Sequence, residues 1–450
     1  MPESFVRLNT LLWSGPVLIA LVAVGMYLLI RMRFLQIRCF PKALKHFIHS
    51  FKLNQEQRNG TSAYRALCTA LAATVGTGNL AGVAGAIALG GPGVIFWMWV
   101  CAILGMGIKF AEVVLAMIYR KRNAKGEWVG GPMQFICCGL KKRYHFIAYI
   151  YCFFCVVASF GIGNGTQINA VICGLDSVFR GFDITLGTLS HVAIGLLLCG
   201  IVWVSFQDGS DRIGRITQML IPLAAVLYMI LALGILIIKR DALLSAAKAI
   251  IQGAFSPRAV TGGTVLSAFQ TLRIGAARGL FTNEAGMGTA AIAHASAEVT
   301  DPVKQGLLGI MEVFIDTIVI CSLTAFVILT SGVPIPYGMD TGIRLTMAAY
   351  ASVYGNWVTI PVTLSVCLFA LATILGWGLY GARSFQYLFG ESSWNRFVMM
   401  QAAMVVVGSV VNTASIWLFS EFVNGLMVLT NLFVVIRLLP VLMEKLKSNV

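Results

Sequence analysis

Charged residues are scarce in this sequence: Asp, Glu, Lys and Arg together make up 11% of its 450 residues. A soluble domain carries about 25% charged residues, which keep it in solution. Hydrophobic residues make up 58% of the chain, and they occur in runs long enough to cross a bilayer, which takes roughly 20 residues per helix. These figures exclude a soluble fold of this size and predict an all-α polytopic membrane protein.

The signatures of soluble enzymes are also missing. The sequence contains no Walker A, GxSxG or HExxH motif, and its five histidines are scattered. Gly76-x-Gly78-x-x-Ala81 nearly matches a dinucleotide-binding fingerprint, but it lies inside an apolar run and follows no strand. We therefore expect no enzymatic activity and no cofactor.

The eleven cysteines form no disulfide framework, because their number is odd and nearly all lie inside apolar runs. Cys152 and Cys155 make a CxxC motif. On a long apolar helix two cysteines at this spacing are more often small apolar fillers than metal ligands or a redox pair.

The net charge of +15 does not indicate nucleic acid, because the basic residues are scattered between the apolar runs. With eleven spans and the N-terminus outside, the odd-numbered gaps and the C-terminal tail hold 24 Lys and Arg, Arg278 among them. The opposite side holds 7, and Lys109 and Arg273 lie at membrane depth. This excess places the C-terminus in the cytoplasm and the N-terminus in the periplasm, as the positive-inside rule requires. A bacterial inner membrane is compatible with this topology.

The apolar runs predict about 11 transmembrane helices in a single domain over residues 1–450. Residues 241–255 and 342–354 have mixed polarity and are expected to form helices at the outer surface. The predicted spans are 11–31, 66–89, 93–118, 145–178, 188–206, 215–238, 262–290, 304–330, 357–381, 396–413 and 416–438.

Two of these spans carry glycine and polar residues in their middle. Residues 74–79 read TVGTGN, and residues 273–279 read RIGAARG. Each glycine destabilises a helix interior by about 1 kcal/mol, so both spans are expected to be broken. The breaks lie five spans apart, which predicts two inverted repeats of five helices, 66–238 and 262–438, after an extra helix 11–31. Close helix packing is the alternative explanation of these glycines.

A broken helix at the midplane offers two kinds of ligand. Its second half begins with free N–H groups and a positive dipole end, which suit the carboxylate of an amino acid near Gly76 and Gly78. Its first half ends in free carbonyls, which suit Na⁺ or an ammonium group.

Other polar residues inside spans have two readings. Asn164 and Gln167 share one helix face, and so do Ala370, Thr373 and Trp377; each set could bind a ligand or only pack between helices. Lys109 and Glu112 are expected to neutralise each other. Glu312 and Asp316 have no basic partner in their own segment, which leaves a cation-binding role open.

Several strings resemble the alanine or glycine:cation symporter family, over about residues 60–440. The resemblance implies a leucine-transporter-like fold, with ten core helices after one extra helix, and symport of alanine or glycine with Na⁺. The strings are GTGNLAG at 76–82, GGPGVIFWMW at 90–99, KFAE at 109–112, GGPM at 130–133, FTNEAG at 281–286, AHA at 293–295 and EVFIDT at 312–317.

The same resemblance implies the ligand contacts. For Na⁺, it implies the carbonyls of Ala72, Val75 and Ala370 and the hydroxyl of Thr373. A proton-coupled carrier of the same fold remains the rival, with Glu312 or Asp316 as the titrating group. A channel or a membrane-embedded enzyme is not supported by a pore element or by paired metal ligands. The implied substrate contacts are Thr77, Gly78, Asn79, Gln167, Ile274, Gly275 and Trp377.

Overall fold

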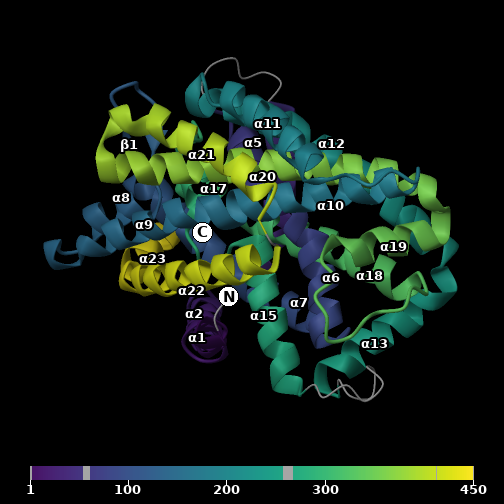
Figure 1. Ribbon diagram of the computed structural model, residues 1–450. Helices are drawn as coiled ribbons and strands as arrows, with labels where there is room; N and C mark the ends of the chain where they lie inside the picture. The colour runs from purple at the N-terminus through teal and green to yellow at the C-terminus, as the bar shows by residue number, and fades with distance from the viewer. Residues whose placement is uncertain (1–2, 54–60, 257–266, 412, 449–450) are drawn as a thin grey trace.

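The computed structural model describes residues 3–53, 61–256, 267–411 and 413–448, and confirms an all-α fold (Figure 1). The only strands in these ranges form a short hairpin of β1 (Lys121–Arg122) and β2 (Trp128–Val129). The helices are α1 (Glu3–Ser14), α2 (Pro16–Arg31), α3 (Leu35–Arg38), α4 (Phe40–Leu53), α5 (Ala63–Thr74), α6 (Ala81–Gly90), α7 (Val94–Tyr119), α8 (Pro132–Gly139), α9 (Phe146–Phe160), α10 (Thr166–Arg180), α11 (Thr188–Ser205), α12 (Gly209–Ile238), α13 (Leu243–Phe255), α15 (Ala268–Asn283), α16 (Thr289–His294), α17 (Pro302–Val313), α18 (Ser322–Thr330), α19 (Ile343–Tyr354), α20 (Thr359–Phe389), α21 (Trp394–Gly408), α22 (Thr413–Arg437) and α23 (Leu439–Lys447).

The described chain has eight helices long and apolar enough to cross a membrane, or nine if the bent pair α5–α6 counts as one span. The predicted spans 262–290 and 396–413 correspond to α15 with α16 and to α21, which are shorter. Residues 262–266 and 412 lie outside the described ranges. The polytopic architecture is thus confirmed, while the count of eleven stays a prediction. The two predicted surface helices form as α13 and α19.

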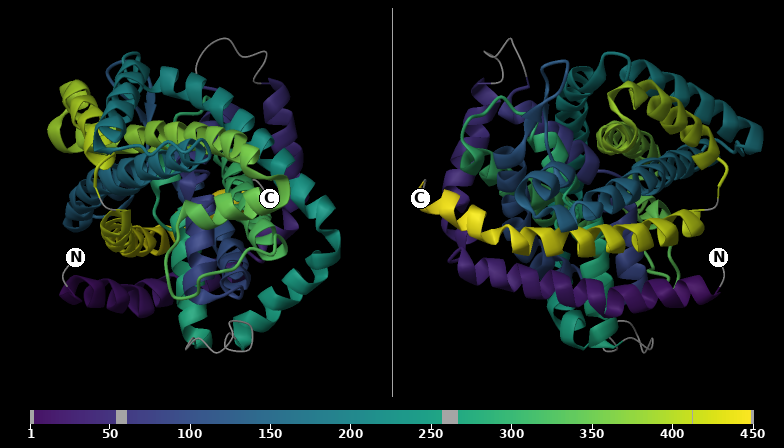
Figure 2. Two further views of the ribbon diagram at one scale, coloured as in Figure 1. Left: turned by 45° about the vertical axis from the view of Figure 1, so that its right-hand side comes forward. Right: turned by 90° about the vertical axis from the view of Figure 1, so that its left-hand side faces the viewer.

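The two termini lie at opposite ends of the helix bundle in the right-hand view of Figure 2. In that view α1 and α2 run side by side with α22, and these helices also contact one another.

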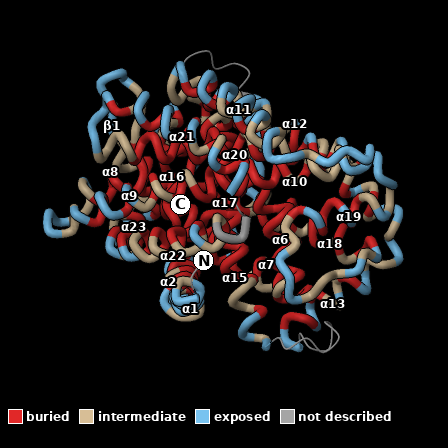
Figure 3. Tube along the Cα trace, viewed as in Figure 1, coloured by how far each residue is buried: buried red, intermediate tan, exposed pale blue. Residues whose placement is uncertain are grey.

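Burial separates central helices from peripheral ones (Figure 3). In α7, 89% of the most apolar 18-residue stretch is buried inside the protein, whereas in α11 only 17% of this stretch is buried. The exposed face of α11 carries Leu189, Leu196 and Leu197, as expected for a surface that faces lipid.

The first predicted helix break is confirmed. Helix α5 ends at Thr74, residues Thr77–Asn79 form one 3₁₀ turn, and α6 continues at an angle of 53° to α5. Gly76 lies between them with an extended backbone.

The second predicted break is wrong in position. Helix α15 runs without interruption through residues 273–279, and the chain leaves it only after Asn283. Gly275 keeps a helical backbone, and its role is to let α15 pack closely on α7. A Cβ added there would lie 2.6 Å from the Val94 carbonyl oxygen. The real break has left-handed backbone at Glu284 (φ 54°), Gly286 (φ 93°) and Gly288 (φ 76°), before α16 begins.

Candidate substrate and cation site

The end of α5 leaves backbone carbonyls without their helical partners. The last bond of this helix runs from the Val75 N–H to the Leu71 carbonyl, at 2.7 Å. The Gly76 N–H donates to Oδ1 of Asn79 at 2.8 Å instead of to the Ala72 carbonyl. Within the described ranges, no hydrogen bond reaches the carbonyls of Ala72 or Val75. Such carbonyls at a helix C-terminus present partial negative charge to a cation.

The next residues meet Gln167 from another helix. Oε1 of Gln167 accepts from the Thr77 N–H at 3.2 Å and from the Thr77 hydroxyl at 2.9 Å. Its Nε2 donates to the Ile162 carbonyl at 2.9 Å. Gln167 follows a π-helical turn, Gly161–Gly165, a feature frequently found at functional sites. The Gln167 side chain thus accepts a hydrogen bond from the backbone N–H of Thr77, which could otherwise bind a carboxylate.

Helix α20 presents Thr373 to the same broken segment. A Cβ added at Gly76 would clash with Oγ1 of Thr373 and would lie 3.2 Å from Oε1 of Gln167. The Thr373 hydroxyl is buried and, within the described chain, has no hydrogen-bond partner. Ala370, one turn before it, is fully buried as well. The structure therefore brings a hydroxyl without a partner beside Gly76, just after the end of α5.

Trp377 lies one turn further along α20 and is fully buried. An added Cβ at Gly163 would clash with the Trp377 Cβ, so the indole is packed on the π-helical turn. Its Nε1 has no hydrogen-bond partner among the described residues, although it lies close to Glu284.

Asn79 is held by its own hydrogen bonds. Besides accepting from Gly76, it donates from Nδ2 to Oδ1 of Asp316 at 2.6 Å and to the Asp316 carbonyl at 3.2 Å. Oδ2 of Asp316 accepts from the Thr317 hydroxyl at 2.7 Å. Asp316 is fully buried and forms no ion pair with a described residue. It therefore remains a candidate to face a positive charge.

The expected pairing of Lys109 with Glu112 is wrong. Lys109 Nζ donates to Oε1 of Glu312 at 3.2 Å, and His294 Nε2 lies 3.1 Å from Oε2 of Glu312. Helix α17 packs directly on α7, and this neighbour supplies the closer carboxylate. Glu312 thus has a basic partner on another helix, and both its oxygens are bonded. Glu112 instead accepts from the Gly288 N–H at 3.1 Å and from Asn431 at 2.5 Å.

Ile274 and Gly275 are not brought to the other predicted substrate contacts. An added Cβ at Gly90 would lie 3.2 Å from Cδ1 of Ile274, at the far end of α6 from Thr77. The ten residues of α6 separate the two places by about 15 Å.

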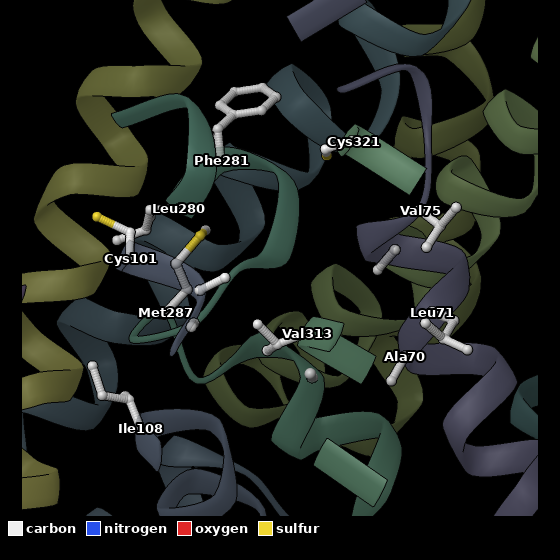
Figure 4. Close-up of a cluster of buried hydrophobic side chains, with 14 of the residues drawn as sticks. Ala70, Leu71, Val75, Cys101, Ile108, Leu280, Phe281, Met287, Val313 and Cys321 are labelled. Atoms are coloured by element: carbon white, nitrogen blue, oxygen red, sulfur yellow. The ribbon is translucent and has the colours of Figure 1, made fainter. Parts of the chain in front are cut away.

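Gly78 faces the end of α15 instead. An added Cβ there would lie 3.4 Å from Thr282 and 3.6 Å from the Phe281 ring, which stacks on Trp417 with centroids 4.4 Å apart. Figure 4 shows Phe281, Val75 and Cys321 among the buried side chains around this segment. Sequence reasoning missed Phe281, Thr282 and Trp417. Phe281 and Thr282 meet Gly78 because α6 packs on α15, and knowing this helix pairing would have identified them.

A hollow of about 440 Å³ lies beyond the stacked rings of Phe281 and Trp417. Arg278 lines it, 3.2 Å from Asp340 and 3.4 Å from Glu421, with its guanidinium 4.8 Å from the Trp417 ring centre. Asp340 also lines a second hollow, together with Arg344.

An ion pair ties the loop between β1 and β2 to α20. Arg383 donates to Glu127 at 2.8 Å. Burial alone would raise the pKa of Glu127, but the charge of the Arg383 guanidinium and hydrogen bonds from Arg383, Asn123 and Ser210 hold this pKa below its usual range. The carboxylate therefore stays charged and paired.

Comparison with known proteins gives one consistent result. The sequence profile of the sodium:alanine symporter family matches residues 2–449. The chain is 35% identical to a sodium/alanine symporter, AgcS, of Methanococcus maripaludis, covering 98% of this chain and 95% of the relative. It is also 35% identical to a probable sodium/glutamine symporter, GlnT, of Bacillus subtilis, over 98% of this chain and 89% of that relative. An uncharacterized transporter of Haemophilus influenzae is 38% identical, over 98% of this chain and 94% of that relative.

A solved structure supports the fold. MhsT in complex with L-phenylalanine superimposes with a TM-score of 0.57 at 15% identity, over 83% of this chain and 89% of that one. This likeness places the chain among leucine-transporter-like folds.

Proposed function

Since the chain belongs to the sodium:alanine symporter family, a family of transporters and not of enzymes, we propose that it imports alanine and glycine together with Na⁺ by alternating access. The observation that carries this proposal is the broken segment between α5 and α6. It places free carbonyls, a free Thr373 hydroxyl and the amide of Thr77 within one buried region.

The proposed Na⁺ ligands are the carbonyls of Ala72, Val75 and Ala370 and the hydroxyl of Thr373. All four are oxygen donors, which hard cations prefer. Their support is the missing hydrogen bonds of the Ala72 and Val75 carbonyls and of the Thr373 hydroxyl. A cation there would satisfy these buried groups.

The proposed substrate contacts are Thr77, Gly78 and Asn79, with Gln167 and Trp377. We infer that the substrate carboxylate takes the Thr77 N–H from Gln167, which then turns toward the substrate. Ile274 lines the hollow of about 440 Å³ and we assign it to the entry path instead of the central site, whereas Gly275 packs against Val94 of α7.

Alanine binding to the purified protein tests the proposal. Na⁺ and alanine should each raise the affinity for the other by the same factor, because linkage between two bound ligands is reciprocal. Alanine should therefore raise the melting temperature in NaCl and hardly at all in choline chloride. An equal shift in both salts would contradict Na⁺ coupling.

Asp316 supports a second candidate, a proton-coupled carrier of the same fold, because this buried carboxylate has no charged partner among the described residues. An alanine affinity that rises with acidity and is independent of Na⁺ would favour that alternative.

Thr373→Ala should raise the Na⁺ concentration needed for half-maximal uptake about tenfold, because one charge-assisted contact worth roughly 1.5 kcal/mol is lost. Thr373→Ser keeps the oxygen and should stay within about twofold of wild type. The measurement is the Na⁺ dependence of alanine uptake into proteoliposomes. Identical dependence in the Ala and Ser variants would show that the hydroxyl is not a ligand.

Trp377→Ala should admit valine or leucine, because the buried indole is expected to limit pocket size. A hydrophobic pocket distinguishes one methylene by only about 1–3 kcal/mol, whereas an oversized side chain is rejected sterically. The measurement is competition of each amino acid against labelled alanine for binding. Trp357→Ala is a matched control, since Trp357 is exposed. A Trp377→Ala variant that still rejects both competitors would place the pocket wall elsewhere.

A further inference from the structure

A second group of buried polar side chains surrounds the break between α15 and α16. Glu112 and Glu284 are fully buried. Oε2 of Glu284 accepts from the Thr289 hydroxyl at 2.6 Å, and Oε1 of Glu112 accepts from the Gly288 N–H and from Asn431. The other oxygen of each carboxylate has no hydrogen-bond partner in the described part of the chain.

The ammonium group nearest to these carboxylates already pairs with a third one, Glu312. Lys109 is bonded to Glu312. Nδ1 of His294 lies 2.8 Å from the amide nitrogen of Gln305 and its Nε2 lies 3.1 Å from Glu312, so both ring nitrogens already have partners. If Glu112, Glu284 and Glu312 were all ionised, these three carboxylates would outnumber Lys109 and His294 in a region closed to water. Burying unpaired charge costs several kcal/mol for each ion.

Neutral donors and acceptors complete the surroundings. The hydroxyls of Tyr151 and Tyr380 are buried and without partners among the described residues, as is the indole N–H of Trp377. Tyr151 interacts electrostatically with both Glu112 and Glu284, and Tyr380 with Glu284. The titratable groups that interact with one or both of these carboxylates are Lys109 on α7, Tyr151 and Cys155 on α9, Glu312 on α17 and Tyr380 on α20.

We propose that Glu112 and Glu284 form a proton-binding site linked to transport. When the break is hydrated, one carboxylate takes a proton from hydronium and leaves water. When the break closes, the resulting carboxylic acid keeps this proton and uses it in a hydrogen bond to a neighbouring oxygen. A proton fits better than Ca²⁺ or Mg²⁺, which take six or more oxygen ligands. Loss of the proton to water reverses the step.

The linkage follows from the chain itself. Glu284 comes two residues after Thr282, which faces Gly78, and lies close to Trp377. A change at the substrate site therefore moves the backbone that carries this carboxyl group. The inference rests on the proposed function, because the proton is linked to the Na⁺-driven carrier cycle.

The test is Na⁺-driven alanine uptake into proteoliposomes between about pH 5.5 and 8.5, with equal pH on both sides. Each variant is scaled to its own rate at pH 7. Wild-type uptake should change by up to about tenfold per pH unit on one side of its midpoint, as one linked proton requires. In Glu284→Gln and in Glu112→Gln the change should fall below about twofold. Glu298→Gln is the control, because Glu298 is partly exposed and pairs with Arg122, and it should keep the wild-type profile.

Glu284→Asp keeps a carboxyl group and should shift the midpoint, which covers the case that the Gln variant fails to fold. A pH indicator in weak buffer should also record proton exchange when alanine is added to wild type in NaCl, but not to Glu284→Gln. A flat wild-type profile, or wild-type profiles in both Gln variants, would overturn the proton site. Wild type that accumulates no alanine at any pH would instead contradict the proposed function.

Discussion

Gly76→Ala is expected to reduce alanine uptake by roughly 5- to 150-fold. The added methyl group would meet the Thr373 hydroxyl and Oε1 of Gln167, the two groups that face the broken segment. Overpacking of a tight site costs about 1–3 kcal/mol, and here the cost falls on the ligand-binding arrangement. The backbone of Gly76 is extended, so the effect would come from space and not from backbone strain.

The measurement is the initial rate of uptake, with Na⁺ and alanine affinities determined on the purified variant. Gly200→Ala is the matched control, because an added Cβ at this position in α11 meets nothing within 4 Å. Wild-type affinities in Gly76→Ala would show that the segment between α5 and α6 does not contact the ligands.

Asn79→Ala should weaken alanine binding by about 10- to 150-fold. The substitution removes the acceptor of the Gly76 N–H and the donor to Asp316, so two buried groups lose their partners. A lost hydrogen bond to a charged group costs about 1.5–3 kcal/mol. The 3₁₀ turn Thr77–Asn79 would lose the side-chain bond that ties it to the Gly76 N–H, and the ligand contacts would lose their geometry.

Titration calorimetry of alanine into Asn79→Ala in NaCl would measure this loss. Asn395→Ala, at an exposed position of α21, controls for loss of an amide elsewhere. Circular dichroism that matches wild type would separate lost binding from lost folding. Unchanged affinity would remove Asn79 from the site.

The sequence was sufficient to predict the broken segment in residues 66–89, because glycines and Asn79 share one turn in an otherwise apolar helix. It misplaced the second break because local composition does not distinguish a glycine that bends the chain from one that packs. A Cβ added at Gly275 would lie 2.6 Å from the Val94 carbonyl oxygen, and this glycine stays helical, whereas Gly286 takes a positive φ. That difference depends on the neighbouring helix.

Charge pairing was mispredicted for a related reason. The spacing of Lys109 and Glu112 on one helix face was visible in the sequence, while Glu312 approaches Lys109 from α17. Likewise, the contact of Thr373 with the segment around Gly76 joins residues about 300 positions apart and follows only from tertiary packing.

Gradient-driven uptake of labelled alanine by purified protein in proteoliposomes tests the central claim most directly. An inward Na⁺ gradient at equal pH should concentrate alanine above the outside level, unlabelled glycine should compete, and collapsing the Na⁺ gradient should release the accumulated label. Accumulation driven by a proton gradient in the absence of Na⁺, or no accumulation under either gradient, would contradict the account.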